Sequence, residues 1–142
     1  MLMAIRLTTT QARAWKIPKA RAVRTRSSPP RRPDGYASQL EADYAVQLEL
    51  QRQHGEIRRW VYEPFRLNLS HGLKPVRYTP DFLVFTESGR CEIHECKGLW
   101  RPKDRVVVKI CADLWREWRV VGVTRSQLMW YYEDFSYPSS NP

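Results

Sequence analysis

The side chains most suited to chemistry lie in the stretch YTPDFLVFTESGRCEIHECKG, residues 78–98. Asp81 precedes one apolar run, and Glu95 and Lys97 lie at the end of the next. Because side chains alternate along a strand, Glu95 and Lys97 are predicted to emerge on the same face. Neighbouring carboxylates repel unless a positive charge lies between them, and Mg²⁺ prefers oxygen ligands. A lysine beside such a metal can orient the water that attacks a phosphodiester.

A hairpin turn is predicted to bring these groups together. Ser88-Gly89, within TESGR, favours a tight turn between the strands VRYTPDFLVF and RCEIHECKG. Opposite residue numbers in a hairpin centred there sum to about 177, which sets Asp81 across from the region of Glu95 to Lys97. The two carboxylates and the amine are therefore expected at one end of a sheet.

The flanking sequence predicts the elements that position this hairpin. Residues 37–53 carry apolar side chains at four-residue steps and indicate an amphipathic helix that ends before Gly55. The segment RRWVYEPFRLNLS predicts a strand, in which Pro64 implies a bulge or an edge position. RPKDRVVVKICADLWREW favours a second helix with Pro102 in its first turn, although its three valines leave a strand as an alternative. WRVVGVT predicts a final strand.

The predicted order is helix, three strands, helix, strand, which indicates an α/β fold with a mixed sheet flanked by helices. At 142 residues, the length indicates one domain, placed at 36–135, between an N-terminal arm at 1–35 and an unstructured tail at 136–142. The aromatic run LMWYYEDF is expected either to form part of a subunit interface or to cover the end of the sheet. With no run of eighteen apolar residues, we expect a cytoplasmic protein without a membrane partner.

The positive charge of the chain is concentrated at its N-terminus. Residues 1–34 hold nine basic side chains and one acid, so they contribute 9 − 1 = +8 of the net +9. This basic arm, residues 1–35, is also rich in Pro and Ser, and it is predicted to stay mobile and to bind nucleic acid phosphates. The alternative is a solubilising tail, or one that binds an acidic protein or ribosomal RNA.

Pro80-Asp81, thirteen intervening residues and Glu95-Cys96-Lys97 resemble the signature of the PD-(D/E)XK nuclease superfamily. The element order αβββαβ is also that superfamily's restriction-endonuclease-like core. More narrowly, SQLEADYAVQLELQRQHGEI, YTPDFLVF and HECKG are similar to small phage-encoded nucleases related in fold to junction-resolving and restriction enzymes. The resemblance covers about residues 36–123.

The resemblance implies a role for each site residue. Asp81 and Glu95 would ligate Mg²⁺, with Mn²⁺ as a substitute, Glu41 on the first helix would join them, and Lys97 would orient or activate water. The expected activity is endonucleolytic cleavage of DNA, structure-specific for branched DNA such as a Holliday junction, by a C2 homodimer if both strands are cut. The alternative is a non-catalytic or partner-dependent DNA-binding subunit of a recombination, transposition or packaging complex.

Structural explanations for the same residues stay open. Glu41 can close a capping box with Ser38, Asp81 fits ordinary turn chemistry, and Glu95 with Lys97 can be an exposed ion pair. A zinc site at Cys91, His94 and Cys96 is disfavoured, because Cys91 is predicted to face away from the other two.

DNA contacts are predicted in two groups. The first lies in the basic arm: Lys19, Arg21, Arg24, Arg26, Arg31 and Arg32. The second lies near the site: Trp100, Arg101 and Lys109. Trp100 can stack on an unpaired base or pack in the core, and Lys109 can face either the site or solvent.

Overall fold

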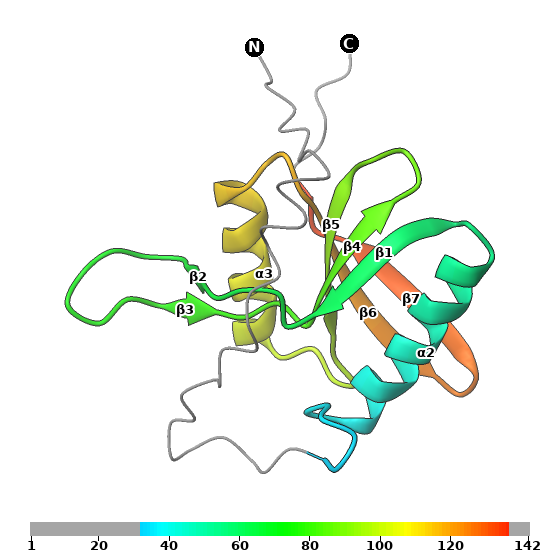
Figure 1. The fold of residues 1–142 in the computed structure, drawn as a ribbon. Coiled ribbons are helices and arrows are strands. Elements are labelled where there is room, and N and C mark those ends of the chain that lie inside the picture. Colours follow the sequence, from blue (N-terminus) through cyan, green and yellow to red (C-terminus); the bar gives the residue numbers. More distant parts are fainter. Residues whose placement is uncertain (1–31, 137–142) are drawn as a thin grey trace.

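The computed structural model describes residues 32–136 (Figure 1). Most of the basic arm, including the predicted DNA contacts Lys19, Arg21, Arg24, Arg26 and Arg31, lies outside the described residues. The predicted tail also lies outside them except for Ser136, whose Oγ accepts a hydrogen bond of 2.9 Å from the Val120 N–H. The ordered domain therefore reaches at least to Ser136.

A mixed sheet of five strands forms the centre of the domain, with the strand order β1-β4-β5-β6-β7. Adjacent strands are antiparallel except β5 and β6, which run parallel. The strands are β1 Ile57–Tyr62, β4 Phe82–Thr86, β5 Cys91–Cys96, β6 Arg119–Ser126 and β7 Met129–Asp134. The α/β fold class with a mixed sheet flanked by helices is thus confirmed.

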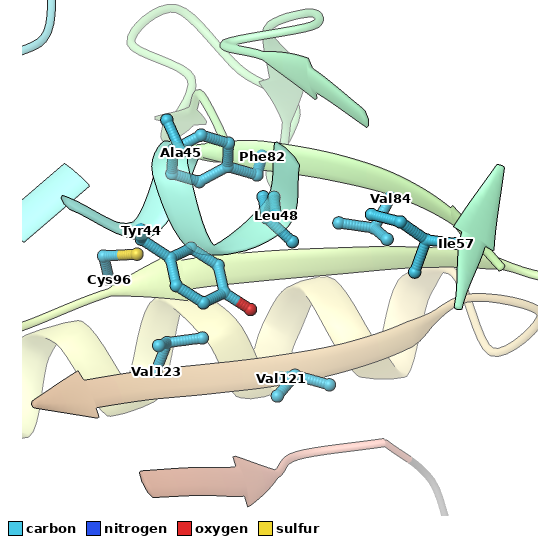
Figure 2. Close-up of a cluster of buried hydrophobic side chains, with 9 residues drawn as sticks. All are labelled: Tyr44, Ala45, Leu48, Ile57, Phe82, Val84, Cys96, Val121 and Val123. Atoms are coloured by element: carbon cyan, nitrogen blue, oxygen red, sulfur yellow. The ribbon is translucent and has the colours of Figure 1, made fainter. Parts of the chain in front are cut away.

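Helices α2 (Gln39–Gln53) and α3 (Pro102–Leu114) cover opposite faces of this sheet (Figure 1). Tyr44 and Leu48 of α2 pack with Phe82 and other even-numbered residues of β4 (Figure 2). Cys111 and its neighbours on α3 pack with odd-numbered residues such as Ile93. Because strand side chains alternate, each face contributes one half of the core. Neither helix of the described region is long and apolar enough to cross a membrane.

The predicted second helix is confirmed, despite its three valines. Pro102 occupies the start of α3, where its missing N–H removes no helical hydrogen bond. Asp104 caps this end by accepting a hydrogen bond of 3.0 Å from the Arg101 N–H. Val108 is buried against the sheet. The helix also makes the crossover that the parallel strands β5 and β6 need.

Two predicted strands are each divided in the structure. After β1 the chain turns at Glu63, with φ 42°, and Pro64, and then forms β2 (Leu67–Asn68). β2 pairs with β3 (Arg77–Tyr78) in a separate hairpin, and Pro80 separates β3 from β4. The two prolines interrupt pairing because they have no N–H to donate to a strand ladder. The prediction of three continuous strands was therefore wrong at these positions.

The C-terminal aromatic run forms a further strand. Residues 129–134 are β7, which pairs antiparallel with β6 at one edge of the sheet. The predicted order of helix, three strands, helix and strand therefore lacked this strand and the β2–β3 hairpin. The tight turn at Ser88-Gly89 is confirmed, since the Gly89 N–H donates to the Thr86 oxygen at 3.0 Å and Gly89 adopts φ 86°.

Candidate active site

Asp81 and Glu95 lie at the same end of the β4–β5 pair. Phe82 is opposite His94 in the register, so Asp81 precedes the last pair and Glu95 follows it. The Cys96 N–H donates to Asp81 Oδ2 at 2.8 Å, and the backbone of Asp81 favours the charged form of the Glu95 carboxyl group and so acts to lower its pKa. The hairpin geometry predicted for these two acids is confirmed, and Asp81 also ties the end of β5 in place.

Glu95 is buried and has a partner at each carboxylate oxygen. Lys97 Nζ lies 2.6 Å from Oε1, and the Tyr78 hydroxyl donates to Oε2 at 2.7 Å. The Glu95 side chain is only 7% exposed, whereas that of Lys97 is 31% exposed. The interpretation of this pair as an exposed ion pair is therefore wrong for Glu95, whose charge lies inside the fold.

Glu41 approaches this end of the sheet from the first turn of α2. Ser38 is the N-cap, and its Oγ accepts from the Glu41 N–H at 3.2 Å and donates to Glu41 Oε1 at 2.8 Å. The Tyr62 hydroxyl donates to Glu41 Oε2 at 2.6 Å. The predicted interaction of Glu41 with the N-cap is present, and the same carboxylate is close enough to Asp81 to influence its pKa.

We call four neighbouring residues the acid cluster: Glu41, Asp81, Glu95 and Lys97. The cluster holds three carboxyl groups and one ammonium. Burial, followed by the charges of Glu95 and Glu41, raises the pKa of Asp81 well above its ordinary value despite the opposing effect of Lys97. Burial also raises the pKa of Glu95, although Lys97 and Tyr78 favour its charged form. Burial works against the Lys97 ammonium, yet the carboxylates of Glu95 and Asp81 raise its pKa. Glu95 and Asp81 therefore share one cation, and Glu41 adds a further negative charge near Asp81.

The donor set of the acid cluster suits a hard divalent cation. It offers carboxylate oxygens only, which favour Mg²⁺ and Mn²⁺ over metals that prefer nitrogen or sulfur. An added positive charge would also relieve the repulsion that raises the carboxyl pKa of Asp81. In residues 32–136, however, no three His, Cys, Asp or Glu side chains are gathered closely enough to hold a metal. Ligation would therefore require side-chain movement within the cluster.

Tyr78 and Tyr62 also belong to the site, although no sequence motif marks them. Each hydroxyl donates to a carboxylate of the acid cluster, Tyr78 to Glu95 and Tyr62 to Glu41. Burial is the main cause that raises the pKa of both hydroxyl groups, so both stay protonated donors. The only available signal was the closeness of Tyr78 to Pro80-Asp81 in the sequence.

The predicted DNA contacts in the described residues have different surroundings. Arg32 is paired with Asp34 at 3.1 Å. Arg101 and Lys109 are exposed at the start and along the length of α3. Trp100 is half-buried: its ring packs on Phe135 with centroids 5.3 Å apart, and its N–H donates to Thr124 at 2.9 Å. These contacts favour the packing interpretation for Trp100.

A second polar cluster, here called the Glu92 cluster, lies on the α2 face of the sheet. His94 Nε2 is 2.9 Å from Glu92 Oε2, and Arg119 donates to Glu92 Oε1 at 3.2 Å. The Tyr44 hydroxyl is 2.7 Å from His94 Nδ1. These residues line a cavity of about 300 Å³. Cys91 packs in the α3-side core and Cys96 in the α2-side core, so the prediction that Cys91 faces away from Cys96 is confirmed.

Comparisons of the chain with family models, with curated proteins and with solved structures found no match. The geometry and charge of the acid cluster are therefore the basis for inferring a function.

Proposed function

We propose that this protein is a Mg²⁺-dependent endodeoxyribonuclease of the PD-(D/E)XK type. The observation that carries the proposal is the convergence of Asp81, Glu95 and Lys97 at one end of two adjacent strands, with both carboxyl pKa values raised. Perturbed buried acids grouped with a lysine are typical of catalytic sites. The strand order β1-β4-β5-β6, with only β5 and β6 parallel, supports a restriction-endonuclease-like core.

In this proposal the carboxylates of Asp81, Glu95 and Glu41 hold the metal. When bound, Mg²⁺ would polarise the scissile phosphate and lower the pKa of a water ligand. Lys97 is protonated, because its pKa is raised by the neighbouring carboxylates. Its ammonium therefore donates a hydrogen bond that orients the attacking water, and it offsets the negative charge that grows on the phosphate. An ammonium has no lone pair to accept a proton, so Lys97 does not deprotonate that water.

The surrounding residues hold these groups in place. Tyr78 fixes one oxygen of Glu95, and the hydrogen bond from Cys96 N–H fixes the carboxylate of Asp81. The donors of these two hydrogen bonds, Tyr78 and Cys96, lie on strands. A rigid element such as a strand positions a reacting group more precisely than a loop does.

The proposal is tested by a matched pair of isosteric substitutions on the same strand. Wild type, Glu95→Gln and Glu92→Gln are incubated with labelled four-way junction, flap, nicked and linear DNA in Mg²⁺, Mn²⁺ or EDTA. We expect wild type to cleave at least one substrate only with metal, Glu95→Gln to be at least about 1000-fold slower, and Glu92→Gln to stay within about threefold. Equal rates for Glu95→Gln and wild type would reject the assignment.

A second candidate function is a DNA-binding subunit that cleaves only beside a partner protein, or not at all. The observation that favours it is that both oxygens of Glu95 already have partners and that the described residues contain no gathered metal ligands. DNA binding with no hydrolysis of any substrate in Mg²⁺ or Mn²⁺ would support this function over the first.

A homodimer also belongs to the nuclease proposal, because cutting both strands of a duplex requires two sites. Light scattering coupled to gel filtration, with and without a junction substrate, measures the mass of the complex. A monomer on a substrate that is cut in both strands would contradict this part of the proposal.

A further inference from the structure

The β2–β3 hairpin is an ordered projection beside the acid cluster. Its base is anchored in the α3-side core by Leu69 and Tyr78, each 7% exposed. Beyond the paired strands, the Leu69 N–H donates to the Val76 oxygen at 2.8 Å, and the Val76 N–H donates to Ser70 Oγ at 2.9 Å. The hairpin extends away from the sheet and both helices (Figure 1). Its tip is therefore closed by hydrogen bonds and surrounded by solvent.

The projection is basic, and its tip is apolar. Residues 64–80 contain Arg66, Lys74 and Arg77 and no acidic residue. All three basic side chains are exposed. Leu73, in the middle of the tip, has a relative exposure of 105%. An isolated exposed leucine is common on protein surfaces, but one at the end of a basic projection has the combination that DNA-bending proteins use to separate stacked bases.

The hairpin is connected directly to the candidate site. Tyr78, the last residue of β3, donates the hydrogen bond to Glu95, and only Thr79 and Pro80 separate it from Asp81. Six residues from base to tip span at most about 20 Å when fully extended. A duplex whose phosphate lies at the acid cluster would therefore pass within reach of the hairpin.

We propose that the β2–β3 hairpin is a DNA-binding element that selects DNA with interrupted base stacking. Arg66, Lys74 and Arg77 bind phosphates beside the scissile bond, and Leu73 inserts where stacking is broken, as at a nick or branch point. The inference rests on the proposed function, because it names the substrate class of the same site. Phosphate contacts by the three cations supply salt-dependent affinity, whereas the leucine supplies the preference for discontinuous DNA.

The test of Leu73 uses the full chain in EDTA, where binding is measured without hydrolysis. Fluorescence anisotropy gives the affinity of wild type, Leu73→Ala and the control Leu128→Ala for four-way junction, nicked and intact duplex DNA. Leu128, between β6 and β7, is 83% exposed and serves as the matched leucine. We expect Leu73→Ala to weaken binding to the junction and the nicked duplex about tenfold and to the intact duplex less than twofold, with no change for Leu128→Ala.

The test of the cations compares Arg77→Gln with Arg90→Gln, an exposed arginine in the β4–β5 turn. Removal of one cation that binds a phosphate should reduce the slope of log affinity against log salt by about 0.9. Arg77→Gln should therefore reduce the slope by about that amount on every DNA, and Arg90→Gln should leave it unchanged.

The inference is overturned if Leu73→Ala and Leu128→Ala give equal affinities for every DNA, or if Arg77→Gln and Arg90→Gln give equal salt slopes. Such a result in a chain that still cleaves DNA would reject the hairpin inference alone. Conversely, an inert chain whose hairpin variants lose junction affinity would reject the nuclease proposal and keep the hairpin as a DNA-binding element.

Discussion

Two glutamates on β5, Glu92 and Glu95, are both buried and both contact basic partners. Their environments nevertheless shift the carboxyl pKa in opposite directions. Glu92 contacts His94 and Arg119 on the α2 face, at 2.9 and 3.2 Å. Glu95 contacts Lys97 at 2.6 Å at the end of the strand that lies beside Asp81. The shorter ion pair belongs to the residue whose charged form is less stable.

The pKa values show the difference. Burial acts against the charged form of Glu92, but the hydrogen bond from His94 and the contact with Arg119 outweigh it and lower the pKa. Burial prevails at Glu95, whose pKa is raised even though Lys97 and Tyr78 donate to it. His94 and Arg119 are the basic partners of Glu92, although Arg119 also pairs with Asp134 at 2.9 Å, whereas Glu95 and Asp81 share the single ammonium of Lys97.

The contrast indicates which cluster is built for structure and which for function. A buried charge that is fully compensated can be retained as part of the fold, whereas an undercompensated group of acids is a stability cost that sites for cations tolerate. This difference is tested by substitutions in or beside the acid cluster, matched where the chain offers it with the corresponding residue of the Glu92 cluster.

The largest expected effect is that of Lys97→Met compared with Arg119→Met. Lys97→Met removes the only ammonium of the acid cluster, so DNA cleavage in Mg²⁺ should fall at least about 1000-fold. Arg119→Met removes a partner of Glu92 and should change the rate less than about threefold. Single-turnover cleavage of a saturating substrate measures both. Similar losses for the two variants would contradict the functional difference between the clusters.

For the free energy of unfolding, the larger loss is expected in the Glu92 cluster and not in the acid cluster. Glu92→Gln removes the charge that binds His94 and Arg119, and it should lower the free energy of unfolding by about 2 kcal/mol, since hydrogen bonds to charged groups are lost. Glu95→Gln removes an undercompensated buried charge and should leave stability within about 0.5 kcal/mol of wild type or raise it. Urea unfolding at pH about 8 measures both. A larger loss for Glu95→Gln would mean that Lys97 fully compensates this acid.

The sequence was sufficient to predict the part of the site that depends on strand alternation and turn position. Ser88-Gly89 fixed the hairpin, and the observed register sets Leu83 opposite Ile93, which brings Asp81 opposite Glu95 within one residue of the predicted alignment. The faces of β5 were also predictable, because a period of two leaves no freedom once one residue is placed.

Other features depend on contacts between distant segments. Tyr78 lies 17 residues from Glu95 and Tyr62 lies 21 residues from Glu41, so no local pattern marks them as hydrogen-bond donors. Pro64 indicates a bulge or an edge position, but the break after β1 also needs Glu63 at φ 42°, which no propensity indicates. The composition of the aromatic run that forms β7 fits both an edge strand and an interface. Only its pairing with β6 shows that it is a strand of the sheet.

A smaller effect is expected when the tyrosine hydroxyl that contacts each cluster is removed. Tyr78→Phe deletes the hydrogen bond to Glu95, which should lower cleavage about tenfold at limiting Mg²⁺ and shift the half-saturating Mg²⁺ concentration upward. Tyr44→Phe deletes the hydroxyl beside His94 and should leave both quantities unchanged. Cleavage rates over a Mg²⁺ titration measure the effect. A tenfold loss for Tyr78→Phe that excess Mg²⁺ does not reduce would show that the hydroxyl has no role in metal affinity.

The smallest expected effect is a pH-dependent gain in stability from Asp81→Asn. The pKa of Asp81 is raised in the folded protein above its ordinary 3.8, so from about pH 4 upward the folded state keeps a proton that the unfolded chain has released. The free energy of unfolding of wild type must therefore fall as pH rises through this window. The asparagine side chain does not titrate, so the variant should match wild type below pH about 4 and exceed it by about 1 kcal/mol at pH about 8.

Glu92→Gln is the control of opposite sign. The pKa of Glu92 is lowered from 4.5, so its stabilising effect is present above that pH and is lost as pH falls through the folded pKa. The deficit of Glu92→Gln should therefore be full at pH about 8 and should shrink in acid, while the gain of Asp81→Asn also shrinks.

Adding Mg²⁺ at pH about 8 should then stabilise wild type more than Asp81→Asn, because a cation in the acid cluster relieves the repulsion that the substitution has already removed. Parallel stability curves for wild type and Asp81→Asn across this range would show that the charge of Asp81 is compensated in the fold, and the contrast between the two clusters would then be lost.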